Sequence, residues 1–230
     1  MLALAVVILL SYLVGAIPSS LWVGRAYKRI DLRNYGSGNL GTTNTFRILG
    51  WKAGIIVGLI DLAKGFVAAY FFSQLGHTVG NGAVTIPFWD LDAFLKIVAG
   101  ISAVGGHMYS PYARFDGGKG VLTAAGMLLG IEPLSVLFSF VIFVIILGTT
   151  RYVSLASIFA SFLYPLFLVM LRYGFGFDID GSVIILAAIL AISIIIKHRG
   201  NIKRLRQGNE NRISSFSPAK GWLNKEQGAT

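Results

Sequence analysis

The residues best suited to chemistry lie in a polar, glycine-rich stretch, residues 35–47 (YGSGNLGTTNTFR), of an otherwise apolar sequence. Glycines allow a backbone to approach a ligand closely. Hydroxyls, amides, backbone N–H groups and a guanidinium are the donors that a cluster of anionic oxygens requires. A plain connection between two helices would also be polar, but it would not need Arg47 and two asparagines among hydroxyls. The stretch therefore predicts an anion site.

A second polar stretch, residues 105–120 (GGHMYSPYARFDGGKG), ends just before a predicted helix. Successive N–H groups in such a turn can form an anion nest, to which the helix N-terminus and Lys119 add positive potential. This is not a Walker loop, because Ala113 stands where its first glycine is required and Gly120 where its serine or threonine is required. His107 could be a general base or a capping donor, although a histidine at the end of a span more often packs at the interface.

Two further stretches carry polar side chains at helical spacing. In residues 197–210 (KHRGNIKRLRQGNE), His198 and Asn201 share a helical face, whereas Lys203 and Arg206 could simply contact anionic lipid headgroups. In residues 149–157 (TTRYVSLAS), Ser154 and Ser157 lie one turn apart. Two small residues at this spacing could bind substrate or only pack one helix against another.

The composition identifies an integral membrane protein. Of the 230 residues, 55% are hydrophobic and 13% are charged, and the mean hydropathy is +0.71, whereas a soluble domain carries about 25% charged residues. The absence of cysteine excludes disulfides, zinc–thiolate sites and a thiol nucleophile. The sequence contains no G-x-S-x-G or H-E-x-x-H motif and no H-x-x-x-x-D signature. We therefore expect no metal and no cofactor.

Hydropathy predicts one all-α domain of seven transmembrane helices over residues 1–210, followed by a polar cytoplasmic tail at residues 211–230. A span needs about 20 largely apolar residues, and Pro18 is tolerated in the first as a kink. Residues 42–49 could form a short helix, and residues 121–131, too short for an ordinary span, pair with the next span as a tight hairpin broken at Pro133. The expected spans are residues 2–24, 51–75, 91–109, 121–131, 134–149, 152–171 and 182–196.

The distribution of basic residues predicts the orientation. Seventeen of the 20 Lys and Arg residues lie in the segments that connect the spans on one side or in the tail, which places the C-terminus in the cytoplasm and the N-terminus outside. All the polar stretches then lie on the cytoplasmic face. Asp61 and Lys64 lie within the second span at i, i+3, where we expect a structural ion pair rather than a catalytic one.

Taken together, GSGNLGTTNTFR, GHMYSPYARFDGGKGV, RYVSLASI and KHRGNIKRLRQGNE resemble the acyl-phosphate:glycerol-3-phosphate acyltransferases of bacterial membranes. The resemblance covers nearly the whole chain. It implies a seven-helix enzyme of the bacterial inner membrane that transfers a fatty acyl group from acyl phosphate to the 1-hydroxyl of glycerol 3-phosphate. The products would be lysophosphatidate and phosphate, in the first step of phospholipid synthesis. Acyl-carrier protein, coenzyme A and nucleic acid are not expected as partners.

The resemblance also implies a role for each motif residue. Ser37, Gly38 and Asn39 would line the acyl-phosphate site. Arg47 and Lys119 would hold the phosphate of glycerol 3-phosphate. The residues assigned a catalytic role are Ser37, Asn39, Arg47, Lys119, His198 and Asn201. Those assigned to substrate binding are Gly38, Gly41, Thr42, Thr43, Asn44, His107, Gly117, Gly118, Gly120, Ser154, Ser157 and Arg204. A transporter or channel for a phosphorylated anion is the alternative, but it would need polar groups along a path to the other face.

Overall fold

The computed structural model describes residues 2–78 and 90–213, and these residues form an all-α fold. Its α-helices are α1 (Leu2–Gly15), α2 (Ser19–Lys28), α3 (Thr42–Leu49), α4 (Trp51–Val67), α5 (Ser73–Thr78), α6 (Leu91–Met108), α7 (Val121–Ile131), α8 (Pro133–Thr150), α9 (Val153–Val169), α10 (Gly181–Lys197) and α11 (Arg199–Arg206). Short π-helical turns, Ala68–Phe72 and Met170–Gly174, extend α4 and α9. The expected loop at residues 76–90 lies mostly outside the described residues.

The predicted membrane architecture is confirmed in its helical character, but not in its count of seven spans. Within the described residues, five helical stretches are long and apolar enough to cross a membrane, and α10 with α11, bent by 57°, can count as a sixth. Helix α7 has 11 residues, whereas a span needs about 20. The seventh span therefore remains a prediction.

The first span departs from the sequence prediction, because Pro18 marks a break rather than a kink. Helix α1 ends at Gly15 and α2 begins at Ser19. The intervening backbone is not helical, although it lies within a candidate span of 27 residues, Leu2–Lys28. Irregular backbone at membrane depth is tolerated only where protein groups satisfy its polar atoms, so the structure must supply partners for this break.

Helices α4 and α7 pack with their backbones in close approach. A Cβ added at Gly65 of α4 would lie 1.9 Å from the carbonyl oxygen of Thr123, and one added at Gly126 of α7 would lie 1.9 Å from that of Leu62. Only glycine permits this contact. One apolar core then joins α6, α7, α9 and α10, and includes Met127 and Leu168.

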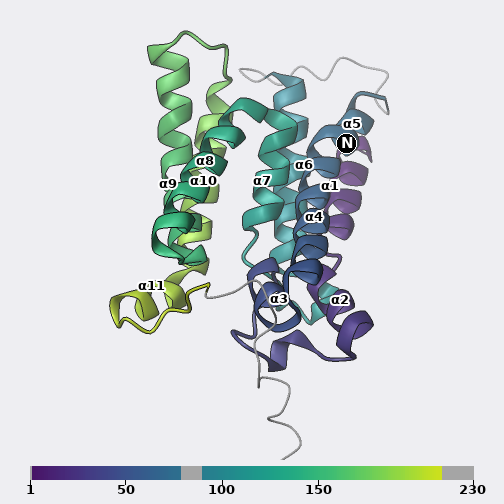
Figure 1. The fold of residues 1–230 in the computed structure, drawn as a ribbon. Helices are drawn as coiled ribbons and strands as arrows, with labels where there is room; N and C mark the ends of the chain where they lie inside the picture. Colours follow the sequence, from purple (N-terminus) through teal and green to yellow (C-terminus); the bar gives the residue numbers. More distant parts are fainter. Residues whose placement is uncertain (1, 79–89, 214–230) are drawn as a thin grey trace, which may run out of the picture.

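The polar motifs gather at one end of the molecule. Figure 1 shows α2, α3 and α11 together at this end, while α1 begins at the opposite end. A second, smaller core lies beneath the loops there and includes Leu21, Leu32, Leu40 and Ala113. The loops that carry the predicted site residues thus rest on a packed platform.

Candidate active site

The glycine-rich loop is shaped from within by Asn44. Its Oδ1 accepts a hydrogen bond from the Ser37 N–H at 3.0 Å, and its Nδ2 donates to the carbonyls of Leu32 and Tyr35. The sequence analysis assigned Asn44 to a substrate site, but the side chain is 1% exposed and its amide is committed to the loop backbone. Gly36 has a φ of +63°, which a residue with a Cβ rarely adopts.

Helix α3 follows this loop and runs back along α4. Phe46 packs against Gly54, and Thr42 packs against Gly58, one turn further along α4. At 1.5 Å per residue, Gly58 lies about 10 Å along the helix from Trp51, which is half exposed at the start of α4. The expected helix at residues 42–49 is confirmed, and its first residue, Thr42, packs against Gly58 of α4.

The expected anion nest at residues 117–120 is only half available. The N–H groups of Gly117 and Gly118 donate to the carbonyls of Met108 (3.3 Å) and His107 (3.2 Å) at the end of α6. In the part of the chain that the structure describes, no hydrogen bond takes the N–H groups of Lys119 and Gly120. The prediction that all four amides line a phosphate site is therefore wrong for two of them, because the C-terminus of α6 uses them first.

His107 lies beneath this loop, buried in the bundle. Its side chain is 8% exposed, and its Nδ1 lies 3.2 Å from Nζ of Lys64. A Cβ added at Gly118 would lie 2.1 Å from its Nε2. The structure therefore places His107 as a support of the loop backbone, in contrast to the predicted contact with substrate.

A network of polar side chains joins Lys119 to helix α11. The Lys119 ammonium donates to Oδ1 of Asn201, and Nδ2 of Asn201 donates to Oε1 of Glu210 at 2.7 Å. The same carboxylate accepts from the Ser154 hydroxyl at 2.9 Å and from Nε of Arg204 at 2.7 Å. The structure thus brings together residues from the second, third and fourth sequence motifs, as the sequence predicts.

Glu210 is the centre of this network, and the sequence analysis did not include it among the site residues. Its side chain is 5% exposed. Burial alone would raise the pKa of this carboxyl group, but hydrogen bonds from Asn201, Ser154 and Arg204 outweigh burial and hold the pKa below its usual value. One signal could have identified it: Glu210 is the only acidic residue among the basic residues of 197–210.

The pKa values of Lys119 and Arg47 are both lowered. Burial lowers the pKa of Lys119 to about 8, opposed by the charge of Glu210 and reinforced by Arg204 and Arg47. Burial also lowers the pKa of Arg47, on which Glu210 and Arg204 act as well. Arg204 is bonded to Glu210 within the network, and the charges of Arg204 and Arg47 both act on Lys119, so the three cations contribute to one electrostatic site. Three cations with one carboxylate leave it positive and suited to an anion.

His198 lies at the junction between α10 and α11 and is 3% exposed. Its Nδ1 lies 2.8 Å from the carbonyl oxygen of Ile194. A carbonyl can only accept, so Nδ1 carries the proton and Nε2 bears a lone pair. The side chain can therefore accept a hydrogen bond or a proton. Ser157 is also buried, one turn from Ser154 on α9.

The remaining predicted residues lie near the N-terminus of α3 or in the loop before it. Gly41 is the N-cap of α3, and the backbone N–H of Thr45 donates to its carbonyl. Thr43 and Asn39 are half-buried, and Ser37 is exposed. Gly38, with a φ of +71°, lies over the carbonyl of Arg33. Among residues 2–78 and 90–213, no hydrogen bond or ion pair joins these residues to the Lys119 network, so their place in a substrate site stays a prediction.

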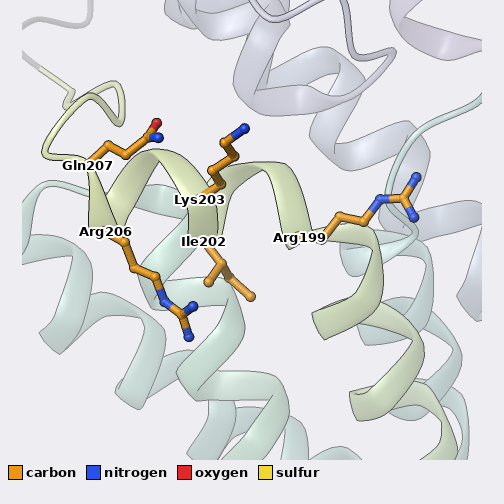
Figure 2. A pocket seen from close by; sticks show the side chains of 5 residues that line it. All are labelled: Arg199, Ile202, Lys203, Arg206 and Gln207. Carbon is orange, nitrogen blue, oxygen red and sulfur yellow. The ribbon is translucent and has the colours of Figure 1, made fainter.

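Helix α11 carries further cations, Arg199, Lys203 and Arg206, outside the Lys119 network. A cavity of about 420 Å³ is lined by Arg199, Ile202, Lys203, Arg206 and Gln207. Figure 2 shows Lys203 and Arg206 pointing to opposite sides of the helix, with Ile202 on the side of Arg206. Such divergent charges suit a broad anionic surface better than a single phosphate. Among residues 2–78 and 90–213, no group of three His, Cys, Asp or Glu side chains could hold a metal ion.

The fold and the site define a helical membrane protein with a cationic, largely buried site at one end of its bundle. Residues 5–208 match the glycerol-3-phosphate acyltransferase family, and the chain belongs to that family. Proteins named glycerol-3-phosphate acyltransferase from Salinibacter ruber and Chlorobaculum parvum are each 44% identical to this chain. The alignments cover 98% of this chain and 99% of the former protein, and 93% of this chain and 98% of the latter.

Solved structures support the same assignment. The crystal structure of PlsY (YgiH), an integral membrane glycerol 3-phosphate acyltransferase in its glycerol 3-phosphate form, superposes with a TM-score of 0.74 at 36% identity. The superposition covers 93% of this chain and 96% of that one. The lysophosphatidic acid form of PlsY matches with the same TM-score at 35% identity, over 92% of this chain and 95% of that one.

Proposed function

We propose that this protein transfers a fatty acyl group from acyl phosphate to the 1-hydroxyl of glycerol 3-phosphate, giving lysophosphatidate and inorganic phosphate. The observation that carries the proposal is the network of Lys119, Asn201 and Glu210, in which Arg204 is bonded to Glu210 and the charge of Arg47 acts on Lys119. It gathers cations in a buried setting, where they bind a phosphate more strongly than at an open surface. Membership of the glycerol-3-phosphate acyltransferase family supports this choice of acceptor.

The position of the site supports a donor that stays in the membrane. Thr42, which follows the glycine-rich loop at the start of α3, packs against Gly58 of α4, and Lys119 precedes α7. The acyl chain of acyl phosphate would lie among the apolar helices, while its phosphate meets Ser37, Gly38, Asn39 and the free N–H groups of Lys119 and Gly120. Glycerol 3-phosphate would enter from the aqueous side and bind to Arg47 and Lys119.

The reaction requires little beyond positioning, because an acyl phosphate is already an activated mixed anhydride. The 1-hydroxyl oxygen attacks the carbonyl carbon, the bond between that carbon and the phosphate oxygen breaks, and the hydroxyl proton leaves with the departing phosphate. Holding the reacting atoms about 3–3.5 Å apart can lower the barrier by roughly 7–11 kcal/mol. Each donor to the developing oxyanion can add about 2.7–4 kcal/mol. His198 Nε2 is the protein's alternative acceptor for the proton.

The proposed setting is the bacterial inner membrane, with seven spans, the N-terminus outside and the active site on the cytoplasmic side. The clustering of Lys and Arg in the segments at the polar end supports this orientation. The short helix α7 would then be the fourth span, packed between α4 and α6 rather than exposed to lipid. Residues 211–230 would form a cytoplasmic tail.

The experiment follows phosphate release by the purified protein in lipid nanodiscs supplied with acyl phosphate, with and without glycerol 3-phosphate. Transfer requires both substrates and yields lysophosphatidate in equal amount. Release without the acceptor would identify a hydrolase instead, and no release would return the anion transporter to consideration. A burst of phosphate accompanied by an acyl ester on Ser37 would reject direct transfer in favour of a covalent intermediate.

A further inference from the structure

Two buried charges within the membrane-spanning part of the bundle are left without a role by the proposed reaction. Asp61 and Lys64 lie on α4 and are 2% and 3% exposed, and their side chains form an ion pair at 2.7 Å. Ionised groups in this setting are costly unless every hydrogen-bonding position is used. The partners of the pair therefore indicate what it does.

Lys64 uses all three of its N–H donors on separate parts of the protein. Besides Asp61, its Nζ donates to the carbonyl of Ile17 at 2.8 Å and to Nδ1 of His107 at 3.2 Å. Ile17 lies in the break between α1 and α2, whose Ala16 carbonyl accepts in turn from the Ser110 hydroxyl. The Ile17 carbonyl also accepts from the Ser19 N–H at 2.9 Å, so Lys64 supplies a second partner and ties this irregular backbone to α4.

Asp61 connects α2 with α3, the helix that follows the glycine-rich loop. Its Oδ1 accepts from the hydroxyl of Ser19, the first residue of α2, at 2.5 Å, and its Oδ2 lies 3.5 Å from the hydroxyl of Thr42. Thr42 begins α3, directly after the glycine-rich loop. The carboxylate therefore joins the start of α2 to the start of α3.

His107 extends the cluster to the GGKG loop. An ammonium can only donate, so Nδ1 of His107 accepts from Lys64 and the ring proton is on Nε2. Nε2 lies against Gly118, and the carbonyl of His107 accepts from the Gly118 N–H. A cavity of only about 10 Å³ is shared by Ile17, Ser19, Leu40, His107 and Gly118, so the two loops and the break lie against one another with little free space.

We propose that the Asp61–Lys64 pair is a positioning element of the active site. It holds the break in the first span, the start of α3 and, through His107, the loop before α7 in one fixed arrangement. This inference rests on the proposed function, because the loops that it fixes are those assigned to the two substrates. Neither residue touches a substrate. Because a misplacement of about 1 Å can cost roughly 10²-fold in rate, loss of the pair should reduce kcat.

The test compares Asp61→Asn, Lys64→Met and the double variant Asp61→Asn/Lys64→Met with the wild type in nanodiscs. Each single variant leaves one buried charge unpaired and should be destabilised, whereas the neutral double variant should recover most of the thermal stability. We expect kcat of the double variant to stay about 100-fold low, with KM for glycerol 3-phosphate changed less than about threefold. Amide exchange at residues 117–120 should be faster than in the wild type.

Lys96→Met is the matched control, because Lys96 forms a pair with Asp92 at 2.7 Å, also one turn apart, near the start of α6. It should leave kcat and exchange at residues 117–120 unchanged. His107→Gln, which keeps an acceptor for Lys64, should retain more activity than His107→Leu. A stable double variant with wild-type kcat would overturn the proposal, as would unchanged exchange at residues 117–120. If the wild type itself transfers no acyl group, the proposed function fails, but the exchange comparison still decides the positioning role.

Discussion

Lys119 and Asn201 are 82 positions apart in the sequence, and the Lys119 ammonium donates a hydrogen bond to Oδ1 of Asn201 in the folded protein. The Nδ2 of Asn201 in turn donates a hydrogen bond to Oε1 of Glu210. This bond joins the loop before α7 to α11, which bends by 57° away from α10. The bend therefore has a consequence for the site: it turns Asn201 and Arg204 toward Lys119 instead of continuing the axis of α10.

Replacement of Asn201 by leucine should impair the reaction while preserving the volume of the side chain. The variant removes a hydrogen bond to a charged group at each end of the amide, each worth about 1.5–3 kcal/mol. We expect loss of the bond to Lys119 alone to lower kcat/KM for glycerol 3-phosphate by about 10- to 150-fold, measured as phosphate release at limiting acceptor. Asn209→Leu is the control, because Asn209 is exposed on the same segment. Equal losses in the two variants would contradict the role of Asn201.

A second prediction concerns Glu210, whose hydrogen bonds hold α11 against α9. Glu210 accepts from Ser154, Asn201 and Arg204, so Glu210→Gln places an amide donor against some of these donors. We expect a loss of about 1.5–3 kcal/mol in the local stability of α11, seen as faster hydrogen exchange of its amides. The exposed Asp116→Asn should leave this exchange unchanged. Wild-type protection in Glu210→Gln would show that α11 is held by its other contacts.

The helices could be predicted from the sequence because their determinants are local. Apolar runs of sufficient length, Pro133 at the start of α8 and the short polar helix before Trp51 each act within one or two turns. The ion pair of Asp61 with Lys64 follows from the same logic, because the two side chains share a helix face at i, i+3. The structure confirms that pair.

The parts that were missed depend on groups that compete across the fold. The N–H groups of Gly117 and Gly118 were expected to bind phosphate, but the last carbonyls of α6 take them. Asn44 was expected at the substrate, but the backbone of its own loop satisfies its amide. Nothing local in the sequence indicates which partner wins. Glu210 was missed although it is the only acidic residue among residues 197–210, because its bond to Ser154 of α9 forms only in the folded protein.

The proposed orientation can be tested with cysteine labelling, because the sequence contains no native cysteine. Asn209 and Asp178 are both exposed and lie after α11 and before α10, at opposite ends of the last span. A membrane-impermeant maleimide should label Asn209→Cys in inside-out vesicles and Asp178→Cys in right-side-out vesicles. The reverse pattern would invert the topology, and labelling of both from one side would exclude a span at α10.

The acidity of Lys119 predicts how the reaction depends on pH. Burial lowers the pKa of this ammonium to about 8, so in the free enzyme the cation is fully present below pH 8 and is lost as the pH rises through that value. Glycerol 3-phosphate is already dianionic in this range and requires the cation. We therefore expect kcat/KM for glycerol 3-phosphate to fall by up to about tenfold per pH unit above pH 8.

The bound dianion favours the charged form of Lys119, so the corresponding fall in kcat should begin at a higher pH. Lys119→Arg separates this effect from other titrations, because a guanidinium keeps its charge throughout the range. The variant should be less active at pH 7, since the planar guanidinium cannot reproduce the single bond to Asn201, but its kcat/KM should no longer fall near pH 8. If the fall persists in Lys119→Arg, another group titrates, and Lys119 is not the cation that binds the acceptor phosphate.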